Sequence, residues 1–90
     1  MEHDQIQKMI SEECDKVKEL LLRKNEEYGD SAFFPKRIFS KASPIEQIKV
    51  RIDDKLSRLS NDSPKTIPED TVQDLIGYLI IMKVAQRIHQ

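Results

Sequence analysis

The chain has 90 residues, and 34% of them are charged, in nearly equal numbers of acids and bases. A chain of this length forms one small domain with a limited core. We therefore expect a single helical domain over residues 1–90 that gains stability from close helix packing or from self-association. The formal net charge of −1 gives no general attraction to nucleic acid or to anionic membranes, so neither is an expected partner.

Cysteine usage and the distribution of apolar residues exclude further classes. Cys14 is the single cysteine, which excludes an internal disulfide and a cysteine-based zinc site. It falls on an apolar helix stripe, where we expect a small buried side chain and not a reactive thiol. The N-terminus lacks the apolar core of a signal peptide, and the apolar run at 75–82 is too short to span a bilayer. A cytoplasmic location is expected.

The first predicted helix covers about residues 4–27. Asp4 and Gln7 have the spacing of a capping box at its start, and Gly29 supplies the left-handed position that commonly ends a helix. Charged residues fill the faces between the apolar positions. Those apolar positions recur at helical spacing and are Ile6, Met9, Ile10, Cys14, Val17, Leu20 and Leu21.

A connector is predicted at residues 30–43. It contains three of the five aromatic residues of the chain, Phe33, Phe34 and Phe39. A loop of this length and aromatic content either packs over the core or lines a ligand pocket.

Two further helices are predicted at about 44–60 and 67–89. The second starts with a serine N-cap at Ser43, proline at the first helical position and glutamate at Glu46. The third is apolar around so much of its circumference that two neighbouring helices are needed to cover it. The expected fold class is therefore all-α: a three-helix, hairpin-like bundle completed by dimerisation.

Two acids stand at the beginning of the third predicted helix. Asp70 and Asp74 are four residues apart, so they share one helix face. Asp70 has a structural explanation, because an acid in the first turn is favoured by the helix dipole. Asp74 has apolar neighbours and needs a cation or a hydrogen-bond donor. Either a base of the second helix (Arg51, Lys55 or Arg58) pairs with it, or Asp74 is a metal ligand.

The second predicted helix carries a further acid, Asp54, at the flank of its apolar stripe. A charge-rich helix face is commonly just solvated. If Asp54 instead faced the acids of the third helix, their charges would repel unless a hard divalent cation took the oxygens, and carboxylates with waters suit Mg²⁺ or Mn²⁺. Lys55 and Arg58 would then neutralise phosphates bound to the same metal.

The end of the first helix supplies a third group of candidates. Residues 24–30 are typical of an ordinary helix end with a glycine stop. Alternatively, Glu27 completes the metal shell, while Lys24 and Tyr28 contact the ligand.

Three stretches together carry a family resemblance: KNEEYGDS at 24–31, RIDDKLSRL at 51–59 and EDTVQDLIGY at 69–78. They resemble, in order, the first type of the nucleotide modification associated domain, a family of small helical proteins of phages and bacteria. The resemblance covers roughly residues 20–85. It implies a role in nucleotide metabolism or DNA modification.

A more distant similarity is to the all-α nucleotide pyrophosphatases of the MazG and dimeric dUTPase kind. Those enzymes bind magnesium through E-x-x-E on one helix and E-x-x-D on the next, cleave nucleoside triphosphates to monophosphate and pyrophosphate, and work as dimers or tetramers. This chain departs from the pattern. Asp70 and Asp74 are four apart, and Asp53 and Asp54 are followed by Lys55 where a glutamate pair is expected.

The sequence thus predicts a magnesium-dependent nucleotide-binding protein, and more specifically a nucleoside triphosphate pyrophosphohydrolase that acts as a homodimer or larger homo-oligomer. The expected catalytic residues are Asp54 and Asp74, and the expected metal ligands are Glu27, Asp54, Asp70 and Asp74. The expected substrate-binding residues are Lys24, Tyr28, Lys55 and Arg58, with the segment 33–39 against the base. The alternative is a non-enzymatic helical adaptor or regulatory dimer whose acids and bases form interhelical ion pairs.

Overall fold

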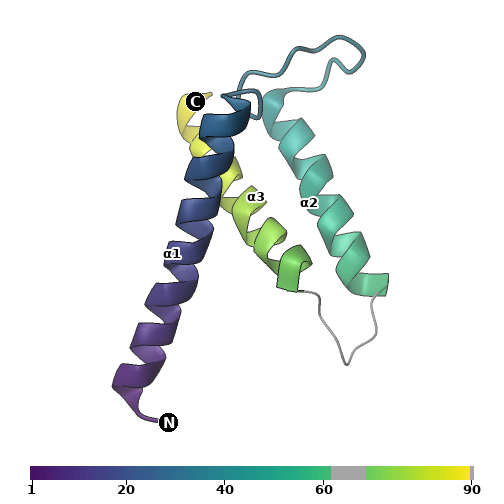
Figure 1. Ribbon diagram of the computed structural model, residues 1–90. Coiled ribbons are helices and arrows are strands. Elements are labelled where there is room, and N and C mark those ends of the chain that lie inside the picture. Colours follow the sequence, from purple (N-terminus) through teal and green to yellow (C-terminus); the bar gives the residue numbers. More distant parts are fainter. Residues whose placement is uncertain (62–68, 90) are drawn as a thin grey trace.

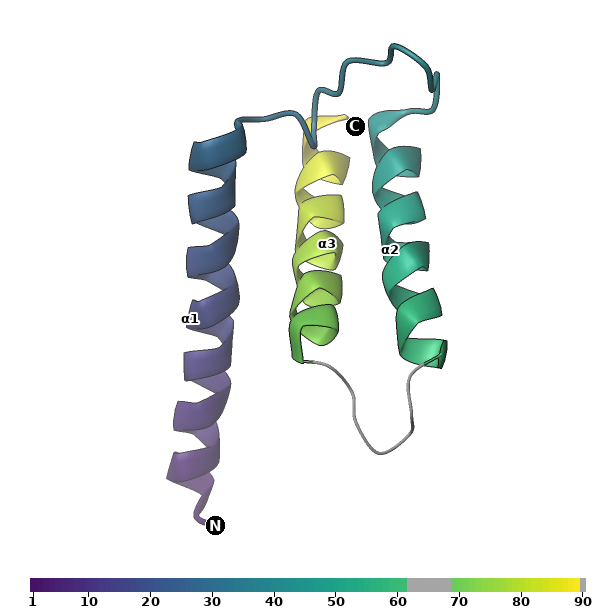
Figure 2. The same cartoon turned by 45° about the vertical axis from the view of Figure 1, so that its right-hand side comes forward.

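Three α-helices form the structure, a computed structural model that describes residues 1–61 and 69–89. They are α1 (His3–Tyr28), α2 (Pro44–Asn61) and α3 (Glu69–Ile88), and the described residues contain no strand. α1 and α3 run in the same direction and α2 runs in the opposite one (Figure 1). Figure 2 shows α3 between the other two helices. The predicted all-α class is confirmed, whereas the predicted start of the third helix at residue 67 lies outside the described residues.

The beginning of α1 differs from the predicted one. Glu2 has an extended backbone and is the N-cap, and its N–H donates to Gln5 Oε1 at 2.9 Å as in a capping box. Asp4 was therefore wrong as the cap. It lies instead in the first turn, where its charge favours the helix dipole. Glutamate and glutamine offer the same reciprocal bonding as the Asp4–Gln7 pair, two residues earlier in the chain.

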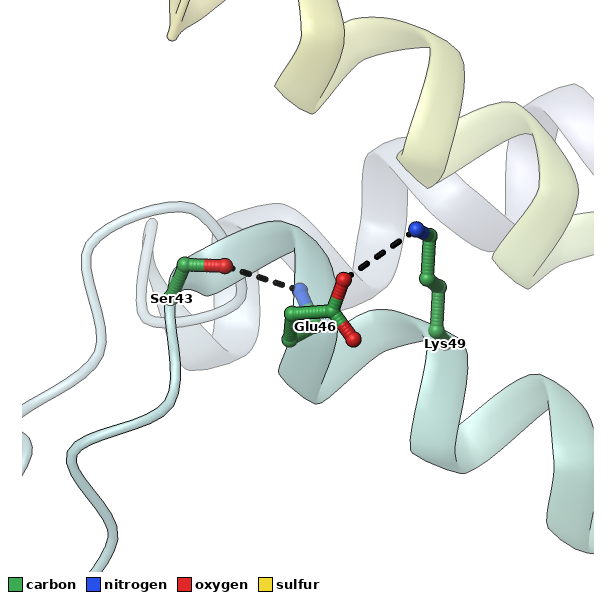
Figure 3. Close-up of polar contacts among 3 residues, drawn as sticks. All are labelled: Ser43, Glu46 and Lys49. Atoms are coloured by element: carbon green, nitrogen blue, oxygen red, sulfur yellow. Dashed lines mark hydrogen bonds and ion pairs between the residues drawn. The ribbon is translucent and has the colours of Figure 1, made fainter.

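The beginning of α2 is the predicted one. Ser43 Oγ accepts a hydrogen bond from the Glu46 N–H at 3.2 Å, and Pro44 occupies the first helical position. The Glu46 carboxylate also forms an ion pair with the Lys49 ammonium at 3.1 Å, which Figure 3 marks with a dashed line. This start fixes where the connector ends.

α3 packs chiefly against α2 and makes a smaller contact with α1. α1 comes close to α3 at Gly77, which is buried; a Cβ there would lie 3.2 Å from Leu21 Cδ2. Ala85, further along α3, is completely buried. Small residues on the central helix thus let a neighbouring helix come close.

The core of a single chain is small. Among the apolar residues described, Val17, Ile48 and Ala85 are buried, while fifteen large hydrophobic residues are exposed. The accessible surface of 7465 Å² exceeds by roughly 2,000 Å² the value of about 5,400 Å² expected for a compact chain of this mass. The radius of gyration of 15.5 Å likewise exceeds the ~12 Å expected.

The large radius of gyration comes in part from the first turns of α1, which extend past the other helices. Because Leu21 faces Gly77 in parallel helices, Glu69 lies at about the level of Glu13, and the residues before it project beyond the start of α3 (Figures 1 and 2). Cys14 lies at this boundary and is exposed. The prediction that it is buried was wrong, because α3 begins too late along α1 to cover it.

Candidate functional site

A groove of about 1430 Å³ lies between α1, α3, the first half of α2 and the connector. Its floor is apolar and includes Leu21, Ile48, Ile81 and Val84. The volume is larger than the roughly 300–1,000 Å³ of a typical small-molecule pocket. A second, shallower hollow on the first turns of α1 measures about 400 Å³.

The lining of the groove is basic. Lys18 and Lys24 come from α1, Lys36 from the connector and Arg51 from α2, whereas Asp30 is the one acid among the described residues that line it. A groove with this excess of positive charge and an apolar floor favours an anionic ligand, because the low-dielectric walls concentrate the field.

Aromatic side chains form another part of the groove lining. Tyr28 and Tyr78 line it from α1 and α3, and Phe33 and Phe34 line it from the connector. Tyr28 and Phe34 are 72% and 62% exposed, so their rings are accessible to a planar ligand. Phe39 is 98% exposed and does not line the groove. The aromatic segment predicted to contact a base is therefore divided, with its first part at the groove and its end in solvent.

The turn after α1 directs the connector to the groove. Gly29 has φ 71° and ψ −157°, a combination that is essentially confined to glycine. Its N–H donates to the Asn25 carbonyl at 2.8 Å, and Asn25 Nδ2 donates to Asp30 Oδ1 at 2.9 Å. The Asp30 carbonyl then accepts the N–H groups of Phe33 and Phe34 at 2.9 and 3.0 Å.

His89 holds the connector against the end of α3. Its Nε2 lies 2.7 Å from the Phe33 carbonyl oxygen, so this nitrogen carries the proton and donates. The ring of Phe34 meets the His89 ring edge to face at 5.4 Å. Sequence reasoning missed this role, because the two partners are 56 residues apart and no local pattern links them.

An interhelical ion pair lies beside the groove. Lys55 Nζ is 3.1 Å from Asp74 Oδ2, and the two side chains are 14% and 34% exposed. Arg51 and Tyr78, which line the groove, are each one helical turn from a member of this pair and on the same face. The structure therefore gives Asp74 the basic partner that was one of its two predicted explanations.

The predicted metal ligands are not gathered into one cluster. Within residues 1–61 and 69–89, no group of three or more His, Cys, Asp or Glu residues is arranged to hold a metal ion. Asp70 is one turn from Asp74 on α3, and it is exposed, as are Glu27 and Asp54. A metal site made by protein side chains alone does not fit the described part of a single chain.

The predicted substrate-binding residues divide between two places. Lys24 and Tyr28 line the groove, whereas Lys55 and Arg58 do not. Lys55 instead binds Asp74, and Arg58 is exposed on the last turns of α2. Arg51, Lys36 and Lys18 are the basic residues of the groove that sequence reasoning did not assign to a ligand. The one-turn spacing of Arg51 and Lys55 was the signal for the first of them.

Lys16 of α1 does not line the groove, and its pKa is shifted. The pKa of Lys16 is raised above its ordinary value of 10.5, chiefly because its ammonium donates a hydrogen bond to Glu13 and is attracted by that carboxylate. Glu69 at the start of α3 raises it further. The Glu69 carboxylate at the start of α3 thus attracts the Lys16 ammonium in the middle of α1.

Comparison with known proteins yields no relative. No protein-family model matches the chain, and neither a curated protein nor a solved structure matches it. The residues of the groove and the three sequence stretches at 24–31, 51–59 and 69–78 are therefore what points to a function.

Proposed function

We propose that the protein binds a nucleotide in the groove. The observation that carries the proposal is that Lys24, Lys36 and Arg51 line the same hollow as Tyr28 and Tyr78. Ammonium and guanidinium groups bind phosphate through charge-assisted hydrogen bonds, and the guanidinium group does so with two parallel bonds. Exposed aromatic rings provide stacking surfaces for a nucleobase.

Magnesium enters this proposal together with the nucleotide. Mg²⁺ is commonly held by one or two carboxylates, several waters and the phosphates of the substrate. Asp74 and Asp70, one turn apart on α3, would be its carboxylate ligands, and Asp74 would have to leave Lys55. Lys55 has a long flexible stem and would then be free to meet a phosphate oxygen. A bound magnesium ion would polarise the phosphate.

The proposed reaction is hydrolysis of a nucleoside triphosphate to the monophosphate and pyrophosphate. It rests on the resemblance of residues 24–31, 51–59 and 69–78 to nucleotide-modification and pyrophosphatase-type proteins. Water attacks the α-phosphorus, the bond from that phosphorus to its bridging oxygen breaks, and a proton is released. Asp54 and Asp74 are the proposed catalytic carboxylates. The positive charge of Arg51 would offset the charge that develops on the phosphate oxygens.

A binding and turnover experiment tests the proposal. We expect nucleoside triphosphates with Mg²⁺ to raise the melting temperature of the protein, and Arg51→Ala to weaken binding at least tenfold in titration calorimetry, since a charge-assisted hydrogen bond contributes about 1.5–3 kcal/mol. Asp74→Ala should abolish magnesium-dependent release of pyrophosphate.

Lys8→Ala is the matched control for Arg51→Ala, because Lys8 is exposed on α1 and does not line the groove. Equal binding by wild type and Arg51→Ala would contradict the proposed site. Undiminished turnover in Asp74→Ala would contradict the catalytic assignment and leave the binding proposal standing.

A second candidate is a non-enzymatic helical adaptor or regulatory dimer. The Lys55–Asp74 ion pair favours it, because Asp74 already has a partner, and so do the fifteen large hydrophobic residues that are exposed in the part of the chain that the structure describes. Dimerisation belongs to both proposals, since a single chain leaves its apolar surface uncovered. The adaptor predicts that neither nucleotides nor Mg²⁺ change the melting temperature, which is the opposite of the result expected above.

A further inference from the structure

The groove has a different chemistry at each of its two ends. Tyr28, Phe33 and Phe34 line it at the connector end. The two charged residues that the connector itself contributes to the lining, Asp30 and Lys36, offset one another in charge. Because the Tyr28 and Phe34 rings are exposed, this end offers stacking surfaces for a planar group and little net charge.

The other end of the groove lies toward the start of α3, at a level set by the contact of Leu21 with Gly77. Lys18 lies one turn before Leu21, and Asp74 lies one turn before Gly77. Since α1 and α3 run in the same direction (Figure 1), Lys18 and Asp74 are at one level. The ion pair with Asp74 brings Lys55 of α2 to that level as well. Each of the three helices thus contributes a charged side chain there, and two of these are basic.

The distance between the two ends suits an extended ligand. Lys18 and Tyr28 both line the groove from α1, and the ten residues from one to the other correspond to about 15 Å along the helix axis. Lys24 and Arg51 line the groove between them, Arg51 being one turn nearer the connector than Lys55. A nucleotide laid along this line would have its base, sugar and phosphates at successive levels.

His89 holds the aromatic end in place. Its hydrogen bond to the Phe33 carbonyl and its ring contact with Phe34 tie the connector to the end of α3. An exposed ring such as that of Phe34, at 62%, has few packing contacts to restrain it, so the His89 ring limits the positions that it can take. A stacking surface that is already ordered loses less conformational entropy when a ligand binds.

We propose that the nucleotide lies along the groove in one direction, with its base at Tyr28 and Phe34 and its terminal phosphates at Lys18. Lys18 is then a phosphate-binding residue, and His89 is a positioning residue that acts through Phe34. The inference rests on the proposed function, from which it takes that the ligand is a nucleoside triphosphate with Mg²⁺ at Asp74.

The opposite direction is unfavourable on two counts. It would place the triphosphate among aromatic rings and close to the Asp30 carboxylate, which repels it, and the base beside the ammonium groups of Lys18 and Lys55. It would also separate the phosphates from Asp74, the proposed ligand of the metal.

Titration calorimetry with three probes tests the phosphate end. The probes are the nucleoside triphosphate that binds most tightly, its monophosphate and inorganic triphosphate, each with Mg²⁺. Lys18→Ala should raise the dissociation constants of both triphosphates about tenfold and that of the monophosphate by less than about twofold, because a monophosphate does not reach Lys18. Lys16→Ala is the matched control, since Lys16 is two residues away and does not line the groove; it should change none of them.

The same probes test the aromatic end. Phe34→Ala should raise the dissociation constants of the nucleoside mono- and triphosphate by the same factor, at least about fivefold, and leave that of inorganic triphosphate unchanged. Phe39→Ala is the control, because Phe39 belongs to the connector but does not line the groove.

His89→Ala should weaken the same two probes as Phe34→Ala, and it should have no further effect in a Phe34→Ala background, because a positioning residue then has no ring to position. A merely structural role would weaken binding of all three probes. Lys18, Phe34 and His89 are exposed, so the variants should keep their helices, which far-UV circular dichroism verifies.

Three results would overturn the inference and leave the proposed function standing. They are a Lys18→Ala variant that loses as much affinity for the monophosphate as for the triphosphate, a Phe34→Ala variant that loses affinity for inorganic triphosphate, and additive effects of His89→Ala and Phe34→Ala. If no nucleotide binds the wild type, the proposed function and the inference are both wrong.

Discussion

The pairing of Asp74 with Lys55 is asymmetric, since the Lys55 side chain is 14% exposed and that of Asp74 is 34% exposed. Removing the carboxylate leaves a largely buried ammonium without its partner, which is costly. Removing the ammonium leaves a carboxylate that water still reaches. Loss of Asp74 should therefore lower the free energy of unfolding more than loss of Lys55, and Asp74 is the residue that sequence reasoning singled out.

A double-mutant cycle measures this asymmetry. We expect Asp74→Asn to lower the free energy of unfolding by about 1–2 kcal/mol and Lys55→Met by less than ~1 kcal/mol, because methionine keeps most of the stem packing. The coupling energy should be about 1 kcal/mol, read from urea denaturation. Equal losses in both variants would show that the burial difference has no energetic consequence.

Individual residues set the limit of prediction from sequence. The acidic face with Asp74 was identified, but three bases on α2 were within reach, and only the register of α2 against α3 selects Lys55. Cys14 was misplaced because helical spacing does not say where a neighbouring helix begins. The metal ligands were assigned from residue type, whereas a cluster depends on the relative rotation of helices, which spacing along one helix does not determine.

At the scale of the elements, a small residue on α3 allows α1 to pack closely against it. The sequence does not mark Gly77 as a packing position, yet its missing side chain is what allows Leu21 to approach. Helix boundaries fared better. The α2 start at Ser43–Glu46 was predicted because capping is local chemistry, in which the bonded atoms are three residues apart.

Substitutions at Gly77 separate helix propensity from packing. Gly77→Ala should change stability by less than about 1 kcal/mol, because the gain in propensity is offset by a contact from which the flexible Leu21 side chain can retreat into the groove. Gly77→Leu should cost about 1–3 kcal/mol through overpacking. Thermal unfolding compares the two, and a tolerated leucine would mean that α1 does not pack closely there.

At the scale of the whole molecule, three apolar side chains are buried among residues 1–61 and 69–89, so the chain gains little from this core. The all-α arrangement with the apolar third helix at its centre was predicted, because a helix that is apolar on most sides must be covered on most sides. The distance by which α1 extends past α3 was not predicted, because the Leu21–Gly77 contact sets that offset and neither helix determines it alone.

The stability of such a molecule should depend on its concentration. Association of folded chains stabilises them by mass action, so a tenfold increase in protein concentration should raise the melting temperature by about 2–5 °C for a domain of this size. Differential scanning calorimetry over two decades of concentration gives the slope. A constant melting temperature would indicate a chain that is stable as a monomer.

The contact of Leu21 with Gly77 also bears on the order in which the chain folds. α2 and α3 are neighbours in sequence and form the larger contact, whereas α1 reaches α3 only across the whole connector and α2. Loop closure disfavours that distant contact, so the α2–α3 hairpin should form first and α1 should dock last. Until it docks, the face of α3 around Gly77 is open to any α1, including that of another chain. A hairpin that accepts a foreign α1 is the starting point of domain swapping, and it makes the connector the hinge.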